Sequence, residues 1–129
     1  MNSRERTLLS LNHKEPDRVP FDMGGTVVTG IGVKAYRNLR KYLGLPEIEP
    51  AIVDIFQQIA KVDDDVLQKL GVDVKNISPR SSATFRIDIK DGGDYWYFYD
   101  EFHIGWRMPK DNGLYYDKFE HPLAGDHIT

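Results

Sequence analysis

The sequence contains no cysteine, which excludes a disulfide framework, a thiol nucleophile and a thiolate metal site. It has no apolar run near the roughly eighteen residues that a membrane-spanning helix needs, and no signal-peptide pattern. Basic residues are not in excess, because 17 Lys and Arg stand against 20 Asp and Glu, for a formal net charge of −3. That balance lacks the electrostatic footprint of a nucleic-acid-binding protein. We therefore expect a cytoplasmic protein that binds neither membranes nor nucleic acid.

The chain does contain enough apolar side chain for a core. Of its 129 residues, 40% are apolar and 12% are aromatic, which argues against wholesale disorder. The length corresponds to one domain at most.

Residues 1–80 have the pattern of an α/β fold with a parallel sheet. Residues 3–12 are expected to form a short helix capped by Ser3. The short apolar stretches 19–22 and 72–77 are expected to be buried parallel strands.

Two helices are expected between these strands. Gly30–Leu43 is amphipathic and is ended by Gly44, and a longer helix runs from Pro50 to Leu70 and is ended by Gly71. Their apolar stripes are Ile31, Ala35, Leu39 and Tyr42 on the first, and Ile52, Ile55, Ile59, Val62, Val66 and Leu70 on the second.

Residues 84–119 predict an antiparallel β-meander. Phe85, Ile87 and Ile89 alternate with polar residues, "DGG" at 91–93 is a hairpin signal, and "DYWYFYD" is the return strand. The aromatic run 95–99 and Trp106 allow two interpretations, a stacking platform for a ligand or a mixture of core and cross-strand pairs.

Several motifs in the chain suggest ligand sites. "GIGVKA" at 30–35 matches the looser dinucleotide fingerprint, but seven residues separate Gly30 from the predicted strand, whereas the fingerprint requires a turn directly after it. "GTVVTGI" has the P-loop spacing without its lysine. Asp63, Asp64 and Asp65 are consecutive, so on a helix they point about 100° apart and form a solvated face rather than a metal site. The four histidines are scattered.

Asp22, Gly24 and Gly25 follow the first predicted strand at its carboxyl end, the edge that carries the active site in parallel α/β folds. Two interpretations of Asp22 stay open at this point. Its carboxylate either orients a ligand or moves a proton, or it caps the loop by accepting hydrogen bonds from backbone N–H groups.

Four stretches in this order, 3–25, 35–45, 54–74 and 105–125, resemble the N-terminal part of the uroporphyrinogen decarboxylase superfamily. More narrowly, they resemble its branch of corrinoid-linked, cobalamin-dependent methyltransferases. The resemblance covers nearly the whole chain and implies the N-terminal portion of a (β/α)8 TIM barrel. Val19–Asp22 and Val72–Ile77 would be its first two strands, and the meander would be an insertion over the barrel mouth. The implied substrate-binding residues are Asp22, Gly24, Gly25, Arg80 and Trp106, and the catalytic residues are unknown.

The chain also departs from that family. True decarboxylases place arginines in the loop after the first strand, where this chain has "MGGTVVTG", and an aspartate after the second, where it has "ISPRSS" with Arg80. We therefore expect a methyltransferase type rather than porphyrinogen decarboxylation, although a decarboxylase fragment is an alternative. The methyltransferase branch implies zinc and a corrinoid for a complete barrel, and we expect this chain alone to bind neither.

A complete barrel takes roughly 250 residues, so we expect 1–129 to be a single partial domain, with 1–80 the start of the barrel and 84–119 the insertion. Such a segment would contribute one wall of the substrate cavity and would not be catalytic alone. It should self-associate or bind a chain that supplies the remaining strands, and a corrinoid protein is a further implied partner. The alternative is a non-catalytic interaction or assembly module derived from the same barrel.

Overall fold

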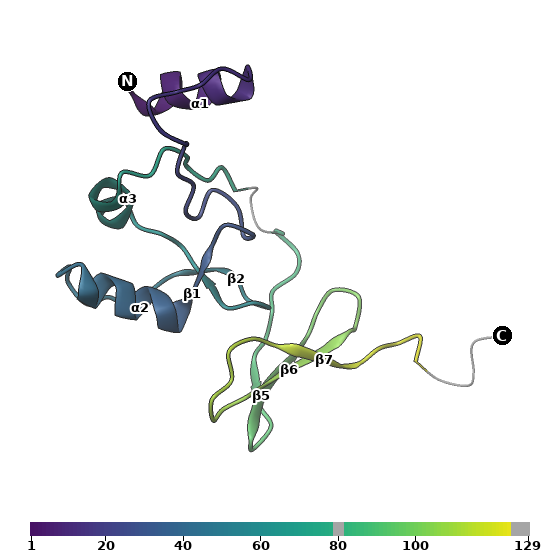
Figure 1. The fold of residues 1–129 in the computed structure, drawn as a ribbon. Coiled ribbons are helices and arrows are strands. Elements are labelled where there is room, and N and C mark those ends of the chain that lie inside the picture. Colours follow the sequence, from purple (N-terminus) through teal and green to yellow (C-terminus); the bar gives the residue numbers. More distant parts are fainter. Residues whose placement is uncertain (79–81, 125–129) are drawn as a thin grey trace. The chain divides into compact units, whose positions relative to one another are not determined.

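The computed structural model describes residues 1–78 and 82–124, which fold as two compact units. Figure 1 labels most of their helices and strands. The first unit contains Met1–Asp54 and Ile59–Ser78, and the second contains Ile55–Gln58 and the described residues from 82 onward. A short loop between two strands of the first unit therefore belongs to the second unit.

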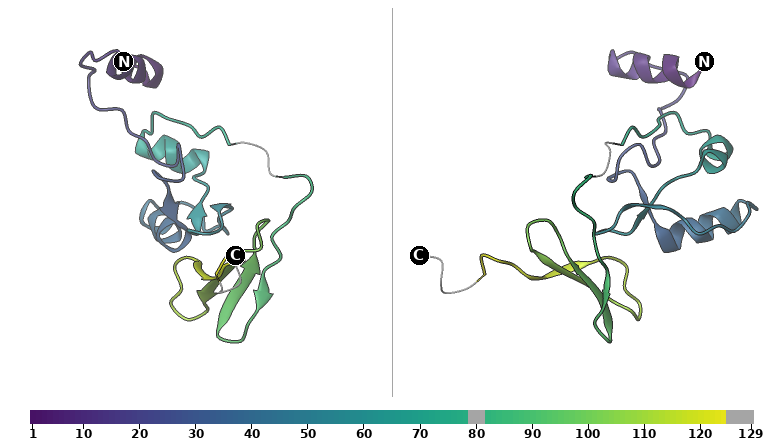
Figure 2. Two further views of the ribbon diagram at one scale, coloured as in Figure 1. Left: turned by 90° about the vertical axis from the view of Figure 1, so that its right-hand side faces the viewer. Right: turned by 180° about the vertical axis from the view of Figure 1, so that it is seen from behind.

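The three helices of the described residues all lie in the first unit, and they are α1 (Ser3–Leu11), α2 (Val33–Tyr42) and α3 (Asp64–Leu70). Helix α1 is where the sequence predicted it, but its cap is Asn2 rather than Ser3. The Asn2 side chain accepts from the Glu5 N–H, and the Glu5 carboxylate accepts from the Asn2 N–H, which is a capping box. Within this unit α1 stands apart from α2 and α3 in every view (Figure 2).

The sheet of the first unit is antiparallel, so the predicted parallel sheet is wrong. It consists of β1 (Ile31–Gly32), β2 (Ile52–Asp54) and β3 (Ile59–Ala60) in the order β1-β3-β2. The predicted strands 19–22 and 72–77 are in neither strand nor helix, and they share one backbone hydrogen bond, from the Asp73 N–H to the Phe21 carbonyl, at 2.8 Å. A parallel strand is normally covered on both faces. Here Val19 and Ile77 are 82% and 95% exposed.

The predicted helix from Pro50 to Leu70 is also wrong over most of its length. Residues 52–60 form the β2–β3 hairpin, and only Asp64–Leu70 is helical. The apolar residues at 52, 53, 55 and 59 are β-branched, which favours a strand over a helix. The predicted end is confirmed, because Gly71 adopts the left-handed conformation with φ +66°.

Helix α2 is confirmed, but it begins three residues later than predicted because Ile31 and Gly32 pair with β3. Its buried residues are Val33, Tyr36 and Arg40. The predicted stripe is confirmed at Ile31 and Leu39, which pack against the core, and is wrong at Ala35 and Tyr42, which are exposed. The core of the first unit joins α2, β3 and α3 through Val33, Tyr36, Ala60 and Val66.

The second unit confirms the meander from Lys90 onward. It consists of β4 (Lys90–Asp91), β5 (Tyr95–Tyr99), β6 (Gly105–Pro109) and β7 (Asp117–Glu120), paired antiparallel in that order. The "DGG" turn joins β4 to β5, and its Gly93 has φ +83°. Phe85, Ile87 and Ile89 precede the first strand, so the predicted start at residue 84 is wrong.

One face of this sheet carries the unit's core. Phe98 is fully buried, and its ring packs 5.5 Å from that of Phe56 and 4.9 Å from that of Tyr116. Trp106 also packs against Phe56, at 4.7 Å between ring centroids.

The described residues thus form a mixed α/β structure with three helices, two antiparallel sheets and no closed barrel. None of the helices in this part of the chain has both the length and the apolar character needed to cross a membrane.

Candidate functional site

The loop after Phe21 is held by its own polar groups. The Asp22 carboxylate accepts from the Gly25 N–H at 2.8 Å, and the Gly24 N–H donates to the Thr29 carbonyl at 2.9 Å. Thr26 and Thr29 each accept the other's backbone N–H on their hydroxyl oxygens. The Asp22 side chain therefore makes the loop-capping contact that was one of its two interpretations.

Gly24 is required by both its conformation and its neighbours. Its φ is +80°, and a Cβ atom there would lie 2.7 Å from the Val62 side chain. A larger residue would therefore strain the backbone and force apart the loop and the segment between β3 and α3.

Segments 19–22 and 72–77 meet at Phe21 and Asp73. Besides the backbone hydrogen bond, the Asp73 carboxylate accepts from the Phe21 N–H at 2.9 Å. This carboxylate has no exposed side-chain surface and also pairs with Arg6 and Arg18, at 2.6 and 2.7 Å. The hydrogen bond from the Phe21 N–H, together with those from the arginines, holds the pKa of Asp73 far below its usual value.

A cavity of about 620 Å³ opens in the first unit. Its wall is formed by the loop residues at 23, 24 and 26, by the segment 59–64, and by residues 74–76 and 78, with Val53 and Leu67. The chain therefore enters the wall of one cavity after Phe21 and again after Asp73. Of the predicted site residues, Gly24 lies in this wall, and Asp22 and Gly25 belong to the same loop.

The cavity wall carries charges of both signs. Lys75 pairs with Asp64 at 2.7 Å, and both side chains are about 70% exposed. Lys61 is exposed, and its ammonium group forms no ion pair with a described residue. Lys61 is thus the cation in this wall that is available to an anionic ligand.

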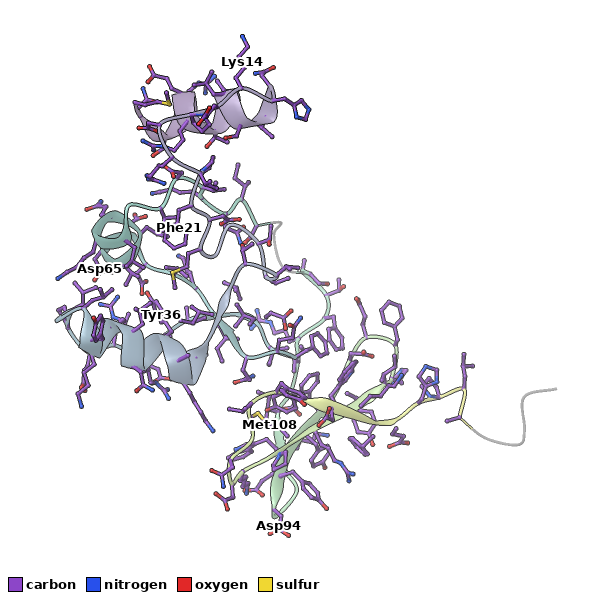
Figure 3. The ribbon with its side chains drawn as sticks, viewed as in Figure 1. Lys14, Phe21, Tyr36, Asp65, Asp94 and Met108 are labelled. Carbon is purple, nitrogen blue, oxygen red and sulfur yellow. The ribbon has the colours of Figure 1, made fainter. Side chains whose placement is uncertain are left out.

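The three consecutive aspartates keep solvent-exposed side chains, as predicted, with exposures of 37% to 70%, but two of them also pair with an arginine. Asp65 makes a bidentate pair with the buried Arg40, with both N···O distances 2.9 Å, and Asp63 contacts the same guanidinium at 3.3 Å. The arginine hydrogen bonds lower the pKa of Asp65. Asp63 also accepts a hydrogen bond from the Tyr36 hydroxyl at 2.7 Å. Figure 3 labels Tyr36 on α2 and Asp65 on α3. These contacts lock α2 against α3.

No group of three His, Asp or Glu side chains among the described residues is arranged to hold a metal ion. Gly30 of the "GIGVKA" motif has a packing explanation instead, because a Cβ there would lie 2.4 Å from the Ile59 side chain. Gly30 precedes a strand that is antiparallel to β3, so the strand–turn–helix geometry of a dinucleotide site is not present here.

Of the two remaining predicted site residues, the described one, Trp106, is not in this cavity wall. Trp106 lies in the second unit, where its indole N–H donates to Asp100 at 2.9 Å and its ring packs against Phe56. Arg80 lies outside the described residues.

The paired arginines Arg6, Arg18 and Arg40 were not predicted from the sequence. The only signal for Arg40 was its spacing of four residues from Tyr36 on a helix, which places the two side chains on one face. Lys61 and Lys75 were also missed, because nothing in their spacing marks them.

Comparisons with protein-family models, with curated proteins and with solved structures found no match.

Proposed function

We propose that this chain is the N-terminal segment of a uroporphyrinogen-decarboxylase-like barrel of the cobalamin-dependent methyltransferase type, and that it contributes one wall of the substrate cavity. The observation that carries the proposal is the contact between Phe21 and Asp73. From that contact both segments run forward into the wall of one cavity.

This arrangement is expected of neighbouring parallel barrel strands. Their carboxyl ends meet at one edge, and ligands of α/β barrels bind at that edge. In the proposal, segments 19–22 and 72–77 become fully hydrogen-bonded β-strands only when the remaining strands of the barrel are added. Their present exposure, 82% at Val19 and 95% at Ile77, is consistent with surfaces that those strands would cover.

The loop and the wall supply three residues with a role in the proposal, namely Asp22, Gly24 and Lys61. Asp22 holds the loop through the Gly25 N–H, and Gly24 allows the loop to approach Val62. Lys61 offers a free ammonium group to an anionic part of the substrate. Arg80 and Trp106 stay candidate residues of the complete cavity.

The methyl-transfer chemistry implied by the family uses zinc to activate a thiol and a corrinoid to carry the methyl group. The described residues do not fit a zinc site, since they contain no cluster of three ligands and the sequence has no cysteine. The proposal therefore assigns to this chain binding and positioning of the substrate, and no step at the metal.

A second candidate function is a non-catalytic assembly module. It is favoured by the same exposed apolar side chains, because Val19, Val28 and Ile77 are each more than four-fifths exposed. A porphyrinogen decarboxylase is less favoured, because the loop 23–30 contains no basic residue to hold substrate carboxylates.

Reconstitution tests the proposal. The chain is co-expressed with a second chain that carries the third to eighth barrel strands of a corrinoid-linked methyltransferase, and co-purification is measured first. Methyl transfer from methylcobalamin to a small thiol is then followed by visible absorbance, with zinc added. A complex that transfers the methyl group supports the proposal, a complex without transfer supports the assembly module, and no complex contradicts both.

Paired glycine variants make this test specific to the cavity wall. Gly24→Val and Gly44→Val both place a side chain at a left-handed φ, but only Gly24 has neighbours within 4 Å of the new Cβ. The proposal expects methyl transfer to fall well below that of the Gly44→Val complex when both complexes form equally. Equal transfer by the two complexes would count against a role for this loop in the cavity.

A further inference from the structure

An exposed aromatic face covers one side of the sheet in the second unit. It consists of Tyr95, Tyr97 and Tyr99 of β5 and Phe119 of β7, and we refer to these four residues as the aromatic face. Side chains alternate along a strand, so Trp96 and Phe98 point to the opposite side, where Phe98 is buried. Tyr95, Tyr99 and Phe119 are each 37–39% exposed.

The geometry of the rings argues against a stacking platform. Tyr97 meets Tyr99 at 88° and Phe119 at 89°, with centroids 6.3 and 6.4 Å apart. Neighbouring rings at right angles cannot stack together on one flat, extended ligand such as a sugar chain. Edge-to-face rings are the arrangement of packed protein surfaces, so a protein partner fits this face better.

The face also carries an unpaired charge of each sign. The Arg107 guanidinium lies between the rings of Tyr95 and Phe119, 5.3 and 5.5 Å from their centroids. Asp117 stands directly opposite Arg107 in the ladder between β6 and β7. Both side chains are exposed, and neither forms an ion pair with a described residue.

We propose that the aromatic face is the contact between two copies of this chain related by a two-fold axis, with Arg107 of each copy paired to Asp117 of the other. A two-fold interface brings a patch against itself, so residue i meets j and j meets i. Such a patch must carry both charges, and this one does. An exposed cation set among aromatic rings would gain a carboxylate partner there without any rearrangement of the sheet.

The size of the face sets the expected affinity. Four partly exposed rings and their charged rim are small beside the roughly 800 Å² per partner of a stable interface. We therefore expect a reversible dimer with a dissociation constant in the micromolar range, so that the chain is monomeric at about 1 µM and largely dimeric at about 300 µM.

Charge reversal tests the contact. Sedimentation velocity is run on the whole chain, on Arg107→Asp and on Asp117→Arg, from about 1 to 300 µM. Each single variant places like charges together at both symmetric positions, so its dimer should weaken by roughly tenfold or more. An equimolar mixture of the two variants places opposite charges together at both positions, and it should form a dimer as readily as the unchanged chain.

Lys118→Glu is the matched control, because Lys118 is on the same strand but pairs with Trp106, which belongs to the other face. It reverses a charge of the same size and should leave dimerisation unchanged. Tryptophan fluorescence verifies that each variant is folded, since both tryptophans lie in this unit. A chain that is monomeric at every concentration, or a dimer that the single variants do not weaken, overturns the proposal. A mixture of the two variants that fails to restore the dimer also overturns the proposal. In each of these cases the aromatic face would instead contact a different protein.

Discussion

The Tyr36 hydroxyl is the central polar atom of the first unit. It donates to the Asp63 carboxylate and accepts from the Asp63 N–H, at 2.7 and 2.8 Å, while the tyrosine side chain is fully buried. Burial raises the pKa of this phenol, so the hydroxyl keeps its proton and the donated bond throughout the neutral range.

We predict that Tyr36→Phe destabilises the first unit by about 1–2 kcal/mol, because it leaves the Asp63 N–H without its acceptor. Urea unfolding followed by circular dichroism at 222 nm measures this, since the three described helices all lie in that unit. Tyr42→Phe, at an 88% exposed position of the same helix, should leave the midpoint unchanged. Equal midpoints for the two variants would contradict the prediction.

Helix α1 is anchored by a network of two arginines and two aspartates. Arg6 donates to Asp17 and Asp73, and Arg18 donates to Asp73. The hydrogen bond from Arg6 lowers the pKa of Asp17 to about 2, and the pKa of Asp73 is also lowered.

Lowering the pH should therefore weaken the ion pairs that anchor α1. Both carboxyls have folded-state pKa values below their ordinary value, so their stabilising contribution is complete above about pH 4 and is lost as the pH falls toward 2. We predict that the urea midpoint at 222 nm falls across this window. Asp73→Asn should lower the midpoint at pH 7 and flatten its fall between pH 4 and 2. Asp94→Asn removes the same charge from an exposed position, and its pH profile should match that of the unchanged chain.

At the scale of elements, the sequence predicted what depends on local signals. Helix α1, helix α2, the glycine ends at 44 and 71 and the "DGG" hairpin all follow from caps, turns and periodicity, and the structure has them. The β2–β3 hairpin was mistaken for a helix because Ile52, Ile55 and Ile59 fit helical spacing. Tertiary pairing with β1 decides such a stretch, and periodicity does not reveal it.

The candidate site was predictable only in its loop. Asp22 and the two glycines were singled out because they follow a predicted strand at its carboxyl end. The structure has no strand there, but the Asp22 carboxylate does cap the loop through the Gly25 N–H. Lys61 and Lys75 lie in the cavity wall because segments that are distant in the sequence come together there. No local sequence pattern predicts that packing. For the same reason the burial of Arg40 on α2 was not predicted, because the aspartates that pair with it come from a distant part of the sequence.

A prediction at the same scale concerns the sheet of the second unit. Adjacent tyrosines differ sharply there, because Tyr116 is 5% exposed and packs on Phe98, whereas Tyr115 is 54% exposed. Tyr116→Ala should destabilise this unit by about 3 kcal/mol, the cost of removing a buried aromatic ring, and Tyr115→Ala by less than about 1 kcal/mol. Tryptophan fluorescence in urea separates the two variants, and a similar loss in both would show that Tyr116 is not part of the core.

At the scale of the whole molecule, the chain passes from the first unit into the second and back within one hairpin. Ile55–Gln58 leaves β2, contributes Phe56 to the second unit, and returns to β3. The Phe56 ring packs against Phe98 and Trp106, and its carbonyl accepts from the Tyr116 N–H at 2.7 Å. Neither unit is therefore a continuous piece of sequence.

This crossing predicts which unit responds to a change at residue 56. Phe56→Ala removes a ring from the aromatic core of the second unit, so tryptophan fluorescence should report a loss of about 3 kcal/mol. Circular dichroism at 222 nm, which follows the helices of the first unit, should shift less, because the core of that unit contains none of the lost contacts. Phe102→Ala removes the same side chain from a position of this unit that is 68% exposed, so it is the control and should move neither signal by more than about 0.5 kcal/mol. If Phe56→Ala shifted the two signals equally, the units would unfold as one cooperative body rather than each with its own core.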